Sequence, residues 1–147
     1  MSIEQLEENY EIIFKFFKII AVLAALPVAT AASGARQISP KDAYSAAMNN
    51  RAILVDVREK DEVTETGIAD LTVWLLTSTI EARGQAFNDA LRALPKEQKL
   101  IFYCRSGRRS EKSADLFSTF GYRTYNAGSI KGWIDAWIHV KAFSPAD

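Results

Sequence analysis

Two short runs of apolar residues most constrain the fold of this chain. Residues 52–57 read Ala-Ile-Leu-Val-Asp-Val and residues 100–103 read Leu-Ile-Phe-Tyr, without alternation between apolar and polar positions. Runs of this kind are typical of strands that are covered on both faces, as in a parallel sheet with helices on either side. We therefore expect an α/β domain with a mostly parallel sheet.

Helical patterns separate these strands. Ser39 is a favourable N-cap and Pro40 suits the first helical position, so a helix is predicted from there to about Met48. A second helix is predicted over 85–94, where four apolar residues share one face. A third is predicted from Arg109 to Phe120, closed by Gly121.

The other segments give weaker patterns. Residues 58–70 are polar and predict a loop with room for one helical turn, whereas residues 71–75 and 123–126 are candidate short strands. A final helix is indicated by five apolar residues at helical spacing, which we expect to pack in the core: Ile130, Trp133, Ile134, Trp137 and Ile138. His139 would lie on the polar side of that helix, in solvent.

The N-terminal segment differs in character from the rest of the chain. Lys15 and Lys18 precede an apolar stretch over 19–28, and small residues with an A-x-A site follow. This order is the layout of a secretory signal peptide. We expect residues 1–31 to be a signal peptide, with an uncleaved membrane anchor or an extra N-terminal helix as alternatives. Export predicts a periplasmic location, and attachment to a membrane is the second choice.

Composition excludes several classes of function. The charges of eighteen basic and eighteen acidic residues cancel. The sequence has no basic stripe with interleaved aromatic residues, so we do not expect a nucleic-acid partner. One cysteine excludes an internal disulfide, and one cysteine with one histidine cannot assemble a zinc site. We expect neither a metal nor a cofactor.

The single cysteine, Cys104, stands between the apolar run at 100–103 and the helix predicted from Arg109. A thiol in a tight loop before a helix N-terminus is close to unpaired amide N–H groups and to the positive end of the helix dipole. Arg105, Arg108 and Arg109 add full positive charge. These surroundings favour the nucleophilic thiolate near neutral pH. The alternative is a buried, inert cysteine; the arginines and the flexible Gly107 argue against it.

Three segments together resemble one known family. The loop Cys104-x-x-Gly107-x-Arg109-Ser110 resembles the active-site loop of rhodanese domains, the sulfurtransferase family. Leu54-Val55-Asp56-Val57-Arg58-Glu59 is similar to the family's strand ending in Asp-x-Arg-Glu, and Gly128-Ser129-Ile130-Lys131-Gly132-Trp133 to its closing Gly-Gly-Ile-x-x-Trp. The resemblance covers about residues 37–140. It implies a rhodanese-like three-layer domain with a mostly parallel central sheet flanked by helices.

The resemblance also implies a thiosulfate sulfurtransferase. The Cys104 thiolate would attack the outer sulfur of thiosulfate or a similar small anionic donor, release sulfite and hold the sulfur as a persulfide. An acceptor such as cyanide or a thiol would then take the sulfur, and a protein acceptor is a further possibility. Sulfite is a stable leaving anion, so no histidine near Cys104 is required.

The residues of the loop divide this work in the expected mechanism. Backbone N–H groups from Arg105 to Ser110 would cradle the anionic sulfur. Arg109 would close the loop, while Arg105 and Arg108 would attract the donor. The expected substrate-binding residues are Arg105, Ser106, Gly107, Arg108, Arg109 and Ser110. Asp56 and Arg58 are expected to brace the loops structurally, and Trp74 is expected to pack.

Two other functions use a similar cysteine. Cysteine phosphatases and arsenate reductases carry five residues between Cys and Arg, whereas only four separate Cys104 from Arg109. The smaller loop suits one sulfur atom better than a tetrahedral oxyanion. The second alternative is a persulfide carrier or binding module with little turnover, which the sequence does not separate from an enzyme.

Overall fold

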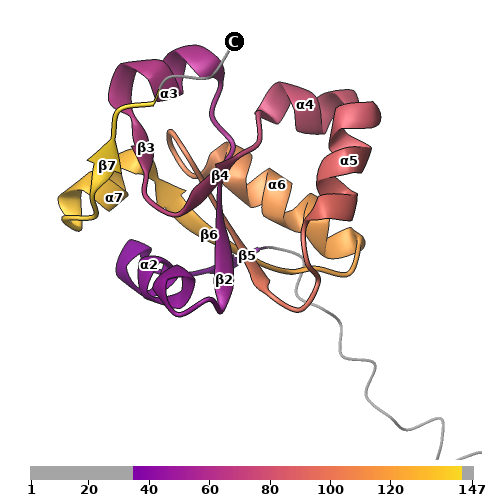
Figure 1. Ribbon diagram of the computed structural model, residues 1–147, viewed down its shortest axis with the longest axis horizontal. Coiled ribbons are helices and arrows are strands. Elements are labelled where there is room, and N and C mark those ends of the chain that lie inside the picture. Colours follow the sequence, from indigo (N-terminus) through magenta and orange to yellow (C-terminus); the bar gives the residue numbers. More distant parts are fainter. Residues whose placement is uncertain (1–34, 144–147) are drawn as a thin grey trace, which may run out of the picture. The chain divides into compact units, whose positions relative to one another are not determined.

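The computed structural model describes residues 35–143, and a five-stranded sheet runs through their centre (Figure 1). The strand order is β1-β6-β5-β2-β4, and every neighbouring pair is parallel. The strands are β1 (Arg36–Gln37), β2 (Ala52–Asp56), β4 (Thr72–Trp74), β5 (Lys99–Cys104) and β6 (Arg123–Ser129). The predicted α/β fold with a mostly parallel sheet is confirmed.

Helices cover both faces of this sheet. They are α2 (Pro40–Met48), α3 (Lys60–Thr66), α4 (Thr77–Ala82), α5 (Gln85–Ala93), α6 (Arg108–Thr119) and α7 (Ile130–Asp135). A separate antiparallel pair joins β3 (Ile68–Ala69) to β7 (Val140–Lys141). Figure 1 shows α2 and α7 to one side of the central strands, and α4, α5 and α6 to the other.

The two apolar runs fill two separate cores, one on each face of the sheet. Along β5, Ile101 and Tyr103 pack with residues of α2 and α7. Leu100, Phe102 and Cys104 pack on the opposite face with residues of α5 and α6. Because consecutive side chains of a strand point to opposite faces, a strand covered on both faces must be apolar throughout. The same geometry places Cys104 on the face that α6 covers.

Several predicted elements are confirmed within a residue or two. The helix predicted after Ser39 is α2, and the Ser39 Oγ accepts a hydrogen bond from the Asp42 amide at 3.1 Å. The helices predicted over 85–94 and from Arg109 are α5 and α6. The weaker strand over 71–75 is β4, and the strand predicted over 123–126 extends to Ser129 as β6.

The loop prediction for residues 58–70 is wrong. This segment contains the seven-residue helix α3 and the strand β3. Helix α3 begins with a capping box between Glu59 and Glu62. The two side chains accept hydrogen bonds from backbone amides of the first turn, which have no partner within the helix. Helix α4, which follows directly after β4, was not predicted because its six residues are too few to establish a periodic pattern.

The final helix is shorter than the apolar pattern indicates. Helix α7 ends at Asp135, and Trp137 has a left-handed backbone with φ of 62°. The predicted core positions Ile134 and Trp137 are 49% and 93% exposed, so this part of the stripe is a wrong prediction. The other three members of the stripe are buried: Ile130, Trp133 and Ile138.

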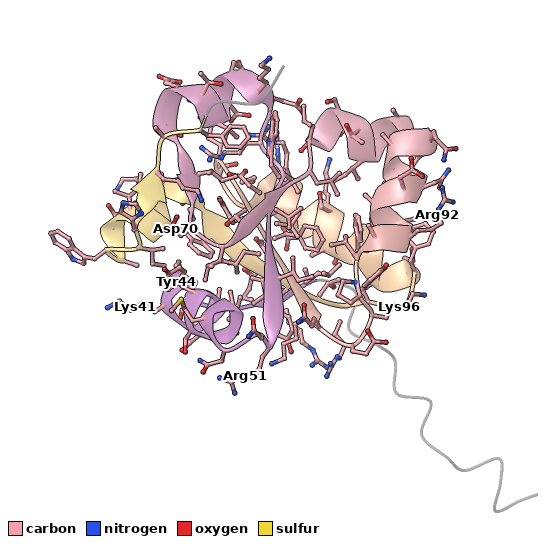
Figure 2. All side chains as sticks on the ribbon, in the orientation of Figure 1. Lys41, Tyr44, Arg51, Asp70, Arg92 and Lys96 are labelled. Carbon is pink, nitrogen blue, oxygen red and sulfur yellow. The ribbon has the colours of Figure 1, made fainter. Side chains whose placement is uncertain are left out.

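His139 lies beyond the end of α7, and its predicted place on that helix is therefore wrong. Its side chain is exposed as expected, and its Nδ1 lies 2.8 Å from a carboxylate oxygen of Asp70, which Figure 2 labels. This contact lowers the pKa of Asp70, mainly through the hydrogen bond from His139. Asp70 and His139 therefore connect the loops that flank β3 and β7.

The prediction for residues 1–31 lies outside the described residues. Among residues 35–143, no helix combines the length and the apolar character that are needed to cross a membrane.

Candidate active site

Cys104 is the last residue of β5, at the carboxyl edge of the sheet. Its neighbour β6 carries one extra residue between Asn126 and Ser129, because Phe102 pairs with the first and Cys104 with the second. Such bulges re-aim side chains at the ends of strands. The Cys104 side chain has no exposed surface and lies at the base of the loop that leads to α6.

The loop surrounds the thiol with hydrogen-bond donors. The Gly107 amide donates to Cys104 Sγ at 3.1 Å, and the Ser110 hydroxyl lies 3.5 Å from the same sulfur. Burial of Cys104 raises its pKa, but hydrogen bonds lower it by more, so that the pKa lies below the ordinary value. The donors are the Ser110 hydroxyl and the amides of Ser110, Ser106 and Gly107. The loop is therefore built to hold an anionic sulfur.

Gly107 is the residue whose conformation allows this loop to close. Its φ of 93° is in the left-handed region, and a Cβ on it would meet the Cα of Gly128 at 3.4 Å. Glycine adopts this conformation at no steric cost, whereas other residues are strained there. The conformation directs the Gly107 amide toward the thiol and starts α6 directly afterwards.

Asn126, a buried residue of β6, contacts the end of the loop and the first turn of α6. Its Nδ2 donates to the Gly107 carbonyl at 3.1 Å, and its Oδ1 lies 2.8 Å from the Ser110 hydroxyl oxygen. Sequence reasoning did not include Asn126 in the site. A signal was available, because asparagine is disfavoured within strands and this one ends the strand predicted over 123–126.

Arg109 is held by an acidic residue of α3. Its two terminal nitrogens lie 2.7 and 2.6 Å from the two carboxylate oxygens of Glu62, in a bidentate pair. The hydrogen bond from Arg109 is the main reason that the pKa of Glu62 is lowered. The pKa of Arg109 is raised, mainly by its hydrogen bond to Glu62 and to a smaller extent by the negative charge of the Cys104 thiolate. The sequence analysis quoted Glu62 only as part of a motif and gave it no place in the site.

The other residues proposed for substrate binding differ in their exposure. Arg105, Ser106 and Arg108 are exposed, whereas Ser110 is buried beside the thiol. None of Arg105, Arg108 or Lys112 is in a salt bridge within residues 35–143. Their charge is therefore available to anions that approach the loop.

Asp56 and Arg58 form a buried ion pair at the neighbouring strand end. Arg58 Nη2 lies 2.6 Å from Asp56 Oδ2, and both side chains are almost fully buried. Arg58 also donates to the Thr66 hydroxyl and the Gly67 carbonyl, each at 2.6 Å. These contacts attach the end of α3 to the end of β2. Through α3 and Glu62, they reach Arg109 in the cysteine loop.

Trp74 packs at the end of β4 and also donates a hydrogen bond. The Trp74 indole N–H donates to the Arg58 carbonyl at 2.8 Å, and its ring packs edge-on against Phe143 with centroids 5.0 Å apart. In the part of the chain from 35 to 143, no three His, Cys, Asp or Glu side chains gather in a way that could hold a metal ion.

A parallel α/β sheet with an anion-binding cysteine loop at a central strand end defines a class of thiolate-dependent proteins. Within that class, this chain belongs to the rhodanese-like domain family, whose sequence profile matches residues 39–138. The human thiosulfate:glutathione sulfurtransferase is 30% identical over 112 residues, which cover 70% of this chain and 96% of that protein.

Solved structures agree with this assignment. The structure of a human single-domain sulfurtransferase is 28% identical with a TM-score of 0.55, over 69% of this chain and 97% of that one. A Rhodopseudomonas palustris protein described as a possible tyrosine phosphatase superimposes with a TM-score of 0.61 at 18% identity, over 73% of this chain and 85% of that one. The last likeness is one of fold alone. The family's named relatives support a sulfurtransferase family for this chain.

Replacement of Ser110 by alanine is expected to raise the pKa of Cys104. Among the hydrogen bonds that lower this pKa, the one from the Ser110 hydroxyl is the largest. The thiolate fraction rises with pH through the pKa, so the titration midpoint of the variant should move to higher pH. Thiolate ultraviolet absorbance across pH measures this, with Ser106→Ala as control because only the Ser106 amide reaches the sulfur. If the titration midpoint of Cys104 does not move in Ser110→Ala, the backbone amides alone lower the pKa of the thiol.

Proposed function

We propose that this protein is a thiosulfate sulfurtransferase that carries sulfur as a persulfide on Cys104. The observation that carries the proposal is the ring of donors around Cys104 Sγ, in which the pKa of the thiol is lowered despite burial. A thiolate held by amides is both a nucleophile and a stable leaving group, and the two half-reactions of sulfur transfer need these two properties.

In the first half-reaction, the Cys104 thiolate attacks the outer sulfur of thiosulfate. A bond forms between Sγ and that sulfur, the bond to the sulfonate sulfur breaks, and its electron pair leaves with sulfite. The persulfide is then formed on the sulfur to which the amides of Ser106 and Gly107 donate. Arg109 lies in the first turn of α6, directly after the loop, and adds positive charge there while Glu62 holds it in place.

In the second half-reaction, a nucleophile removes the outer sulfur and Cys104 leaves as a thiolate. We propose a low-molecular-mass thiol or cyanide as the acceptor, and the name of the human relative, thiosulfate:glutathione sulfurtransferase, supports a thiol. A protein thiol is a second class of acceptor. No proton transfer to the leaving group is needed in either step, because sulfite and the Cys104 thiolate both leave as anions.

A loading and turnover experiment tests this function. After incubation with thiosulfate, intact-protein mass spectrometry should show the gain of one sulfur atom, and steady-state assays with cyanide should show ping-pong kinetics. Loading without turnover would identify a persulfide carrier instead. Hydrolysis of an aryl phosphate faster than sulfur transfer would identify a phosphatase and overturn the proposal.

Replacement of Arg105 by alanine is expected to raise the KM for thiosulfate about threefold, with a smaller change in kcat, because an exposed charge beside a site mainly attracts the substrate. The effect should shrink as salt is added. Arg51→Ala is a matched control, because Arg51 is also exposed. It precedes β2 and therefore lies at the amino ends of the parallel strands, whereas Cys104 lies at their carboxyl ends. Equal KM values for the two variants would show that Arg105 does not attract thiosulfate to the site.

We also propose that the chain is exported, on the sequence pattern of residues 1–31. N-terminal sequencing of the native protein tests this. A mature N-terminus close to Ala32 is expected, and an intact Met1 in a membrane fraction would favour the anchor.

A further inference from the structure

The segments that lead into the strands of the central sheet carry a row of cations. Because β1, β6, β5 and β2 are parallel, these segments lie toward one edge of the sheet, which we call the amino edge. Cys104 ends β5 and lies at the opposite, carboxyl edge. The segments of the amino edge are 35–36, 49–52, 94–99 and 120–123. Their cations are Arg36, Arg51, Lys96, Lys99 and Arg123.

Three of these cations are neighbours across the sheet. Lys99 and Arg123 are register partners as the first residues of β5 and β6. The Lys99 amide donates to the Arg51 carbonyl at 3.4 Å, so Arg51 stands beside them in front of β2. Figure 2 labels Arg51 and Lys96 on this edge. The amino edge therefore carries positive charge across several neighbouring strands.

Acidic side chains do not neutralise this charge. None of the five cations is in a salt bridge within residues 35–143. Within the four described segments, Glu97 is the one acid. Lys96 Nζ donates to the Phe120 carbonyl at 3.1 Å, and Arg123 donates to the Glu97 carbonyl. Backbone carbonyls thus hold two of the cations in place, and both keep their full charge.

Two exposed apolar side chains accompany the cations. Met48, the last residue of α2, is 58% exposed, and Phe120, which follows α6, is 38% exposed. Both helices end at the amino edge, because each returns the chain from the carboxyl end of one parallel strand to the start of another. Cations beside exposed apolar side chains are typical of surfaces that bind anionic lipids, where the charges meet headgroups and the apolar groups meet acyl chains.

The described chain also begins at this edge. Ala35 precedes β1, and only residues 29–34 separate it along the sequence from the apolar stretch over 19–28. A fully extended chain spans at most about 3.5 Å per residue, so a bilayer in contact with that stretch would lie within about 25 Å of Ala35.

We propose that the amino edge binds the surface of a membrane that contains anionic lipids. The five cations bind headgroup phosphates, and Met48 and Phe120 contact the acyl chains. Lys99 and Cys104 are five positions apart on β5, which is about 16 Å or roughly two Debye lengths at physiological salt. The cysteine loop then faces away from the bilayer, where the negative surface potential no longer repels an anionic sulfur donor. Binding of this kind needs no sulfur chemistry.

Vesicle binding of the full chain tests this surface. The partition coefficient is measured on vesicles of phosphatidylcholine alone and on vesicles of equal parts phosphatidylcholine and phosphatidylglycerol. The ratio of the two coefficients reports the anionic headgroups, because apolar insertion contributes to both. We expect binding to the anionic vesicles to be stronger by about tenfold or more and to weaken as salt is added. Equal binding to both kinds of vesicle would overturn the proposal.

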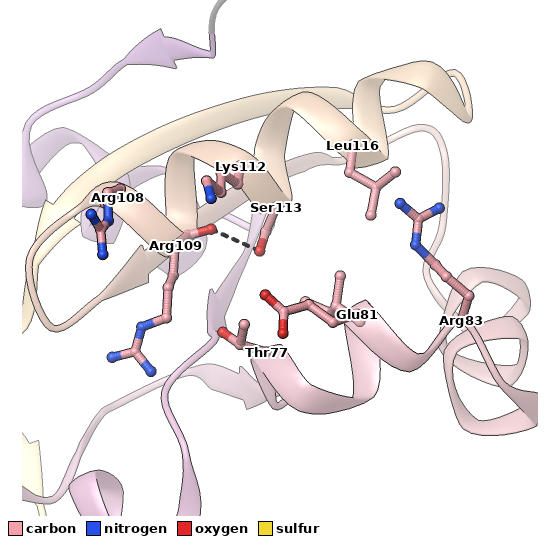
Figure 3. Close-up of a pocket in the computed structure, with 9 residues that line it drawn as sticks. Thr77, Glu81, Arg83, Arg108, Arg109, Lys112, Ser113 and Leu116 are labelled. Atoms are coloured by element: carbon pink, nitrogen blue, oxygen red, sulfur yellow. Dashed lines mark hydrogen bonds between the residues drawn. The ribbon is translucent and has the colours of Figure 1, made fainter.

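Variants identify the edge that binds. Arg36→Gln/Arg51→Gln removes two exposed cations of the amino edge, and the ratio should fall about tenfold. The control, Arg108→Gln/Lys112→Gln, removes the same charge from the start of α6, where both residues line the pocket between α4 and α6 (Figure 3). The ratio for the control should stay within about twofold of the wild type. An unchanged ratio in Arg36→Gln/Arg51→Gln, or equal falls in both variants, would overturn the proposal.

A fluorescent label gives the orientation independently. In the Cys104→Ser background, Met48→Cys and Lys112→Cys each supply a single thiol for an environment-sensitive dye. Anionic vesicles should shift the emission to the blue for the label at position 48 and not for the label at position 112. The opposite result would place the cysteine-loop end on the membrane and overturn the proposal. Unchanged thiosulfate:cyanide turnover of Arg36→Gln/Arg51→Gln without vesicles is expected, and it shows that lost vesicle binding is not lost folding.

Discussion

Replacement of Cys104 by serine is expected to abolish sulfur loading and to lower sulfurtransferase turnover by about a thousandfold or more, since the covalent intermediate cannot form. The chain has no other cysteine to take over this role. A serine hydroxyl at this position can still accept from the Gly107 amide, so the loop keeps its main hydrogen bond. Mass spectrometry after thiosulfate treatment and a thiosulfate:cyanide assay measure the two effects.

The same variant separates chemistry from folding. Its free energy of unfolding should change by no more than about 2 kcal/mol, because the substitution exchanges one small buried group that accepts a hydrogen bond for another. Circular dichroism and urea denaturation serve as controls. Sulfur loading that persists in Cys104→Ser would place the chemistry at another residue and would refute the proposed mechanism.

Replacement of Asp56 by asparagine is expected to destabilise the domain by about 3 kcal/mol, because it leaves the buried Arg58 charge without its counter-charge. Arg58 is 1% exposed and cannot reach water to compensate. The side chains of Asp and Asn have nearly the same shape, so the loss reports charge and not packing. Urea denaturation monitored by tryptophan fluorescence gives the free energy of unfolding.

An exposed pair provides the comparison for this effect. Asp89 and Arg92 on α5 form a similarly short ion pair, but their side chains are 59% and 66% exposed. Exposed pairs contribute little, so Asp89→Asn should leave the midpoint of unfolding almost unchanged. A destabilisation of equal size in both variants, or in neither, would show that burial does not control the strength of the Asp56–Arg58 pair.

The sulfurtransferase function also predicts a dependence on pH. The pKa of Cys104 is lowered, so the reactive thiolate persists to lower pH than that of an ordinary cysteine and is lost as the pH falls through the pKa. The rate of sulfur loading should therefore reach its plateau at a lower pH than for an ordinary thiol and should decrease as the pH falls below the pKa of Cys104. A rate that continues to increase into alkaline solution would mean that the loop does not stabilise the thiolate.

Elements with strong local patterns were predictable from the sequence. The strand β5 is apolar throughout, and α2 and α5 carry clear capping or amphipathic signals. The short helices α3 and α4 were missed, because each is too short for a periodic pattern and part of their stabilisation comes from outside their own segments. Glu59 at the start of α3 accepts hydrogen bonds from the amide and hydroxyl of Ser78 in α4. A pattern search within either segment cannot reveal such a contact.

The last helix illustrates the opposite error. Its five apolar residues follow a helical period, yet the helix stops before Trp137, which the structure leaves exposed. Periodicity indicates which residues could share a face, but it does not show whether a neighbouring element covers them. Ile134 and Trp137 have no such cover among the described residues, because the chain turns toward β7 after Ala136.

The sequence by itself determined the nucleophile and its immediate loop. Cys104, Gly107 and Ser110 lie within seven consecutive positions, so strand, turn and helix preferences were enough to place the thiol against amide donors. Only the tertiary structure decided what holds the loop and what surrounds it. Asn126 and Glu62 contact the loop from positions 16 and 47 residues away, and the pocket forms where α4 meets α6. Local preferences act over a few residues, whereas such contacts exist only after the sheet has brought distant segments together.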